Sequence, residues 1–319
     1  MAAVQTVLGA VEPEALGFTL THEHLFIGWP GWYLDPVPPD QKREQYGTLV
    51  GRLRAAHASG VRTVVDASPF ELGRDMELLC RLSQDTGIHI IASTGFYHEA
   101  WGLPVYLKMR TVEELAEILL IELTQGAGDH QVRPGAIKIA ASGQSLGKHE
   151  SKALLAAATA SKATGVPILT HAAGPAVALE QASGLVNEGV RPGAVQIGHC
   201  DGFALDELEA VLRTGVTIAF DQVVYQHTVT LAQRVTRLKQ LLARGWEQQI
   251  TLSHDQIGIL GGRQVALAGC TREFTYLHNE FLPALRDAGL TPAQEARLTV
   301  TNPAAWLGGG AHASNGWTR

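Results

Sequence analysis

Short apolar runs bounded by Gly, Pro or Asp recur along the chain, and longer segments with apolar residues at helical spacing lie between them. The runs that predict β-strands are Gly17–His24, Val61–Asp66, His89–Thr94, Ala136–Ala140, Pro167–His171, Val195–His199, Thr217–Phe220 and Ile250–Ser253. A regular alternation of strand and helix is typical of βα units, in which successive strands run parallel in one sheet.

The expected helices include Asp40–Ser59, Thr111–Leu123, Glu150–Thr164, Thr228–Arg244 and Phe274–Ala288, and a glycine follows each of them at or near its end. Eight strand–helix alternations favour an α/β fold of the (β/α)8 TIM barrel type over a doubly wound sheet, because no Gly-x-Gly-x-x-Gly turn follows any of the strands. We expect a single domain over residues 1–319, with an N-terminal extension at 1–16 that forms a hairpin under the barrel and a flexible tail at 308–319.

Composition narrows the class of protein. With 319 residues, 45% of them hydrophobic, the chain can bury a large core. A net charge of -6 without a Lys/Arg cluster argues against a nucleic-acid surface, so a small, uncharged electrophile is the better substrate class. Three well-separated cysteines indicate a reducing compartment rather than a disulfide framework. The N-terminus lacks the pattern of a signal peptide and no apolar run is long enough to span a bilayer, so we expect a cytoplasmic protein without a membrane span.

Chemically useful side chains fall at the ends of five of the eight expected strands. They are His22 and His24 on the first, Lys138 on the fourth, His171 on the fifth, His199 on the sixth and Asp255 on the eighth. The carboxyl ends of barrel strands meet at one rim, where TIM-barrel enzymes place their reactive groups. Singly, each histidine could be an ordinary core or surface residue, and Asp255 could cap a helix. Together they are the nitrogen and oxygen donors of a transition-metal site.

Lys138 lies between Ile137 and Ile139 in an apolar strand, where an ammonium group is costly to bury. A structural salt bridge to Asp255 is one interpretation. Burial also lowers the pKa of a lysine, and a neutral amine can form a Schiff base with a carbonyl substrate or take up carbon dioxide as a carbamate. The carbamate is favoured here because its two oxygens can bridge cations held by the neighbouring donors.

Seven other histidines are expected to be structural: His57, His89, His130, His149, His227, His278 and His312. His254 should point away from Asp255, because side chains alternate along a strand. It could therefore contact a ligand from behind but not hold a metal itself.

Four segments resemble signatures of the phosphotriesterase family of the amidohydrolase superfamily, which includes the phosphotriesterase-like lactonases. They are Gly17–Leu25, Ala136–Ala140, Gln196–Asp201 and Thr299–Ala304. The resemblance implies one metal on His22, His24 and Asp255 and a second on His171 and His199. It also implies that carbamylated Lys138 (N6-carboxylysine) and a hydroxide bridge the two ions, with Asp255 taking the proton of the attacking hydroxide. Zinc is the default metal, with cobalt, manganese or iron as alternatives. A homodimer is the usual assembly in that family.

The reaction expected from such a site is hydrolysis of a lactone, a carboxylic ester or a phosphotriester. The resemblance favours a lactonase with secondary phosphotriesterase and esterase activity, because Tyr97 matches a tyrosine that these lactonases place over the metals. Gln222 stands where they tend to have an arginine, which keeps a dedicated phosphotriesterase or carboxylesterase open. Alternatives of other classes are a metal-independent Schiff-base lyase that uses Lys138 and a non-catalytic metal-binding protein. The expected pocket residues are Phe70, Tyr97, Trp101, Gln222, Tyr225 and Ile257.

Overall fold

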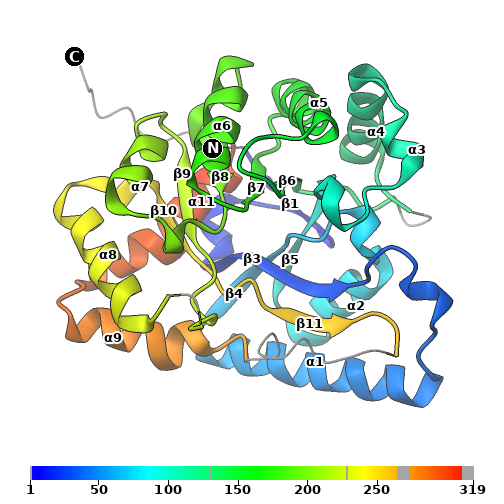
Figure 1. The fold of residues 1–319 in the computed structure, drawn as a ribbon. Helices are drawn as coiled ribbons and strands as arrows, with labels where there is room; N and C mark the ends of the chain where they lie inside the picture. The colour runs from blue at the N-terminus through cyan, green and yellow to red at the C-terminus, as the bar shows by residue number, and fades with distance from the viewer. Residues whose placement is uncertain (1, 129–130, 228, 264–272, 311–319) are drawn as a thin grey trace.

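The computed structural model describes residues 2–128, 131–227, 229–263 and 273–310. Its main sheet contains β3 (Phe18–Ile27), β4 (Val61–Asp66), β5 (His89–Gly95), β6 (Ala136–Ala141), β7 (Ile168–Ala172), β8 (Val195–Ile197), β9 (Thr217–Phe220), β10 (Ile250–Leu252) and β11 (Ile257–Leu260). The strand order is β10-β9-β8-β7-β6-β5-β4-β3-β11, and neighbouring strands are parallel. Figure 1 shows this sheet curled inside a layer of helices, which confirms the expected TIM-barrel class.

The ends of the curled sheet meet between β10 and β3. Just beyond β10, the N–H of Asp255 donates to the carbonyl oxygen of His22 at 3.0 Å, and the hydroxyl of Ser253 accepts the N–H of His22 at 2.9 Å. These bonds bring the last expected metal ligand directly beside the first.

The helices that cover the sheet are α1 (Pro39–Ser59), α2 (Met76–Thr86), α3 (Val105–Lys108), α4 (Val112–Gln125), α5 (Lys148–Thr164), α6 (Pro175–Asn187), α7 (Leu205–Leu212), α8 (Leu231–Ala243), α9 (Leu282–Asp287), α10 (Pro292–Ala296) and α11 (Asn302–Leu307). A capping box begins α4 where the expected helix Thr111–Leu123 starts, because Thr111 and Glu114 exchange side-chain to backbone hydrogen bonds at 3.2 and 2.8 Å. The predicted end of α1 is also confirmed, since Gly60 follows it with φ 118°, a conformation that favours glycine.

Three local predictions were wrong. The expected strand Val195–His199 ends at Ile197, because the N–H of His199 turns to donate to the carboxylate of Asp221. The expected strand Gly17–His24 continues to Ile27 as β3, because its extended end pairs with β11, a strand that was not expected. The expected helix Phe274–Ala288 starts instead as a π-helical turn over Leu277–Phe281 that leads into α9, with no helix over its first residues. Thr228, where another helix was expected to start, lies outside the described residues.

The N-terminal extension forms the predicted hairpin. Its strands β1 (Val4–Thr6) and β2 (Gly9–Val11) are antiparallel, and the N–H of Val7 donates to the carbonyl of Ile90 near the start of β5. Val4 also packs with Trp306 of α11 in an apolar cluster at this end of the barrel. At the other terminus, Gly308 and Gly310 hydrogen-bond to carbonyls of α11, and residues 311–319 of the expected tail lie outside the described residues.

Within the described ranges, no helix is both long and apolar enough to cross a membrane. Cys80 and Cys200 are free thiols, and Cys270 lies outside the described residues.

Candidate metal centre

His22 and His24 project from the same face of β3, and each has one ring nitrogen fixed by a partner. Nδ1 of His22 lies 2.6 Å from Asp221, whose carboxylate can only accept, so this nitrogen carries the proton. Nδ1 of His24 lies 2.8 Å from the hydroxyl of Ser68, which already donates to the carbonyl of Phe26, so here too the imidazole donates. In the neutral rings, both Nε2 atoms are therefore left as lone pairs, the form that binds a metal.

These two lone pairs converge on Asp255 and Lys138. Oδ1 of Asp255 lies 3.7 Å from Nε2 of His22 and 3.4 Å from Nε2 of His24. Nζ of Lys138, whose side chain is fully buried on β6, lies 2.9 Å from Nε2 of His22. Burial lowers the pKa of Lys138 to about 8, although the charges of Asp255 and Asp221 oppose this shift.

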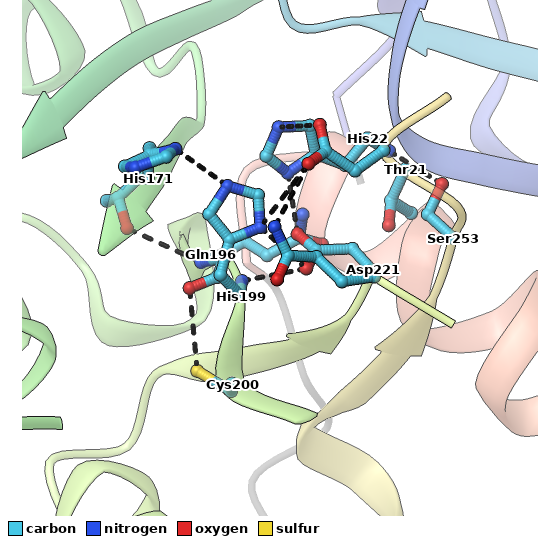
Figure 2. Close-up of polar contacts among 12 residues, drawn as sticks. Thr21, His22, His171, Gln196, His199, Cys200, Asp221 and Ser253 are labelled. Carbon is cyan, nitrogen blue, oxygen red and sulfur yellow. Dashed lines mark hydrogen bonds and ion pairs between the residues drawn. The ribbon is translucent and has the colours of Figure 1, made fainter. Parts of the chain in front are cut away.

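His171 and His199 form a second group beside the first. Nε2 of His199 lies 2.7 Å from Nδ1 of His171 in a hydrogen bond, while the backbone N–H and Nδ1 of His199 both point to Asp221 at 2.7 and 3.1 Å (Figure 2). Burial, together with the neighbouring His199 and Lys138, holds the pKa of His171 well below its ordinary value. His171 is therefore a neutral imidazole, the form that can bind a metal, and it lies beside His199.

Asp255 stands at the centre of both groups. Burial favours its neutral form, but the neighbouring imidazoles of His199, His24 and His22 outweigh that effect and hold the pKa of Asp255 well below its usual range. Gln222 donates to its Oδ2 at 3.2 Å, and the hydroxyl of Tyr225 donates to its carbonyl oxygen at 2.7 Å.

The structure thus brings together all six residues that the sequence singled out. Asp221, which sequence reasoning did not single out as a functional residue, holds His22 and His199 at once and is fully buried. Burial opposes its ionisation, yet the two histidines lower the pKa of Asp221 far below the usual range, so it stays a carboxylate. Its signal in the sequence was its place at the end of the expected strand Thr217–Phe220, the same signal that identified the ligands.

Aromatic side chains line the rim on the side of His171. The ring centroid of Tyr97 lies 5.6 Å from that of His171. The ring centroid of His98 lies 4.2 Å from that of Tyr97 and 5.5 Å from that of Trp101. His98 was not among the expected site residues, although it follows Tyr97 directly. Its Nδ1 is buried without a hydrogen-bond partner among the described residues, and burial lowers its pKa to about 4. Trp101 is 56% exposed and packs against Trp29.

The other expected pocket residues have different surroundings. Phe70 makes an edge contact with Phe96, and Ile257 pairs with His24 through the β11 ladder. His254 points away from the ligands, as expected, and is fully buried against Glu23. His278 packs on Phe18, while His130 and His312 lie outside the described residues.

The donor set fits a divalent transition metal. Ligand atoms of His22, His199 and Asp255 lie within 4.8 Å of one another, and their neighbours already hold the nitrogens that would not bind. Imidazole and carboxylate donors suit zinc and the other late first-row ions. The arrangement can therefore activate water and polarise an electrophile when metals are bound.

Comparison with known proteins gives the same picture along the whole chain. A model of the phosphotriesterase family matches residues 2–307. The chain is 30% identical over 292 residues to the phosphotriesterase homology protein of Escherichia coli strain K12. This alignment covers 91% of this chain and 97% of that protein. The chain is also 32% identical over 255 residues to the aryldialkylphosphatase of Saccharolobus solfataricus. That alignment covers 77% of this chain and 79% of that enzyme.

The fold comparison agrees. A solved structure of a variant PTE-like lactonase from Deinococcus radiodurans superposes with a TM-score of 0.90 at 35% identity, covering 95% of this chain and 99% of that one. Since the family match spans the entire barrel, the chain is a member of the phosphotriesterase family and, like its relatives, a hydrolytic enzyme.

Proposed function

We propose that this enzyme is a binuclear-metal lactonase with weaker activity toward aryl esters and phosphotriesters. One observation carries the proposal: Nε2 of His22, Nε2 of His24, Oδ1 of Asp255 and Nζ of Lys138 converge at one point of the rim. His22, His24 and Asp255 would hold one ion, His171 and His199 the other, and Lys138 would join them as its carbamate. Zinc is the ion we propose.

When bound, two cations would lower the pKa of a water and polarise the oxygen of the electrophile. The chain supplies the rest. Asp255 accepts the proton of the water, and it is available as a base because its neighbours keep it ionised. Gln222 and Tyr225 hold the carboxylate and the backbone of Asp255 in place.

The lining of the rim supports an uncharged substrate. Tyr97 and Trp101 present aromatic surface on one side, and Gln222 presents an amide on the other. Burial and the charges of Asp255 and Glu71 raise the pKa of the Tyr97 hydroxyl, so this group is a neutral hydrogen-bond donor at all physiological pH values. A neutral ring ester needs a hydrogen-bond donor and apolar surface, whereas an anionic substrate would need an arginine cluster.

Initial rates on an aliphatic lactone, an aryl ester and an aryl dialkyl phosphate, measured on metal-loaded protein, test the proposal. We expect the lactone to have the highest kcat/KM. A higher kcat/KM for the phosphate would favour a dedicated phosphotriesterase, and a higher one for the ester a carboxylesterase. Borohydride trapping of Lys138 by a carbonyl compound in metal-free protein would favour the lyase alternative. From the family resemblance we also propose that the protein is a cytoplasmic homodimer. Light scattering of the purified protein tests whether it is a dimer.

A further inference from the structure

Glu23 lies between two of the proposed ligands in sequence, but its side chain points to the other side of β3 and is fully buried. Its carboxylate accepts four hydrogen bonds. Oε1 accepts the hydroxyl of Ser253 at 2.7 Å, the backbone N–H of His254 at 2.9 Å and Nδ1–H of His254 at 2.8 Å. Oε2 accepts the backbone N–H of Gln256 at 2.8 Å. Every one of these donors belongs to a residue within two positions of Asp255.

The tautomer of His254 follows from its second partner. Its Nε2 lies 3.0 Å from the backbone N–H of Leu277, which can only donate, so Nε2 accepts and Nδ1 carries the proton toward Glu23. Leu277 is the first residue of the π-helical turn before α9. His254 therefore links this turn to the carboxylate behind β3.

Asp255 itself has a left-handed backbone with φ 56°, which costs free energy for any residue except glycine. Such a conformation persists only where the surroundings fix it. Here the flanking N–H groups of His254 and Gln256 are both held by the carboxylate of Glu23, and the N–H of Asp255 is held by the carbonyl of His22. With its backbone fixed in this way, the side chain of Asp255 reaches His22 and His24.

We propose that Glu23 and His254 are positioning residues, which set the backbone of Asp255 so that its carboxylate completes the metal-binding group with His22 and His24. The inference rests on the proposed function, since it assumes that this group holds a metal. Neither residue touches the ligand atoms. They act on metal affinity through the conformation of the turn at 253–256.

The variant Glu23→Gln distinguishes a hydrogen-bonding role of the carboxylate from a role in packing alone. The amide has almost the same shape as the carboxylate, but only one of its two ends can accept. If its oxygen takes the place of Oε1, its NH2 group faces the N–H of Gln256; if it takes the place of Oε2, the NH2 group faces Ser253 and His254. At least one donor beside Asp255 loses its partner, and the left-handed turn relaxes.

The test is binding of Co²⁺ to metal-free protein, followed by visible absorption and by competition with a chelator. In the wild type we expect two ions per chain. In Glu23→Gln and in His254→Phe we expect the ion on His22, His24 and Asp255 to bind about ten- to a hundred-fold more weakly, with a changed absorption spectrum. Because both residues act on one turn, the double variant should lose no more affinity than the weaker-binding single variant.

Glu209→Gln is the matched control, because Glu209 is also a buried carboxylate that accepts bonds from Arg213, Arg244 and Trp246, but it belongs to α7. It should bind Co²⁺ as the wild type does. If Glu23→Gln fails to fold, His254→Phe alone carries the test, because it removes the side-chain donor of His254 to Glu23.

Unchanged affinity and spectrum in folded Glu23→Gln and His254→Phe, or an equal loss in Glu209→Gln, would overturn the inference. A wild type that binds no Co²⁺ would instead overturn the proposed function, so the two failures are distinct.

Discussion

If Lys138 carries the proposed carbamate, activation of the metal-free enzyme should depend on pH and on carbon dioxide. Carbon dioxide reacts with the neutral amine, and burial lowers the pKa of Lys138 from 10.5 to about 8. The neutral fraction at pH 7 is then about 10%, roughly 300-fold more than for an exposed lysine. Lowering the pH to 6 cuts it to about 1%, and raising the pH to 8 brings it to about one half. Carbamylation should therefore accelerate roughly 50-fold between pH 6 and 8 and then level off.

The assay is the lag before steady hydrolysis after divalent metal is added to metal-free protein. All buffers are equilibrated with the same partial pressure of carbon dioxide, so that the dissolved gas is equal at each pH. The lag should shorten as the pH rises through about 8 and as carbon dioxide increases, and ¹³CO2 should label the protein in a carbon NMR spectrum. Lys138→Gln, with no amine, is the control that should show neither label nor dependence. A lag that ignores both pH and carbon dioxide, or a wild type without label, would refute the reasoning.

Three further outcomes are expected. Asp221→Asn removes the charge that fixes His22 and His199, so both metals should bind about ten- to a hundred-fold more weakly, as measured by metal content after dialysis against a graded chelator series. Asp255→Asn should lower kcat by about 10²–10⁴-fold on every substrate, because it removes the proposed proton acceptor. Equal losses in kcat for lactone and phosphotriester in stopped-flow assays would identify a shared step. For metal-free, carbon-dioxide-free protein, the free energy of unfolding should rise by about 3 kcal/mol from pH 8 to 10.5. In this pH range the unfolded chain keeps the proton on Lys138, whereas the folded chain has released it. Urea unfolding of the wild type tests this slope, and Lys138→Met, which has no amine to titrate, is its control.

The parts of the fold that follow from local chemistry were predictable. Val61–Asp66 and Thr217–Phe220 are apolar runs with clear boundaries, and the observed strands match them residue for residue. β11 was not predictable in this way, because its residues pair only where β3 extends past the barrel, and Gly258 lies so close to the carbonyl of Leu25 that a side chain there would clash. A strand that depends on a distant partner leaves little trace in its own sequence.

The same distinction applies to the site. The proposed ligands were found because polar residues at the ends of apolar strands stand out, and strand order alone brings them to one rim. His98 was missed because an imidazole within a loop has no such contrast, and its contacts with Tyr97 and His171 depend on how the loop after β5 folds back.

Two buried carboxylates that accept backbone N–H groups at or beside proposed ligands, Asp221 and Glu23, explain how a barrel rim can present ligands at fixed positions. His199 and Asp255 both follow their strands in left-handed conformations, with φ 63° and 56°. His199 lies next to Asp221, which directly follows β9, and Asp255 lies next to Glu23 within β3. Asp221 accepts the N–H of His199, and Glu23 accepts the N–H groups on either side of Asp255. Hydrogen bonds to a buried charge are stronger than those to a neutral acceptor, so they can offset the cost of the left-handed residues. Because this support lies behind the ligands, residues on the open side of the rim, such as Trp101, can change substrate preference without moving the metal-binding group.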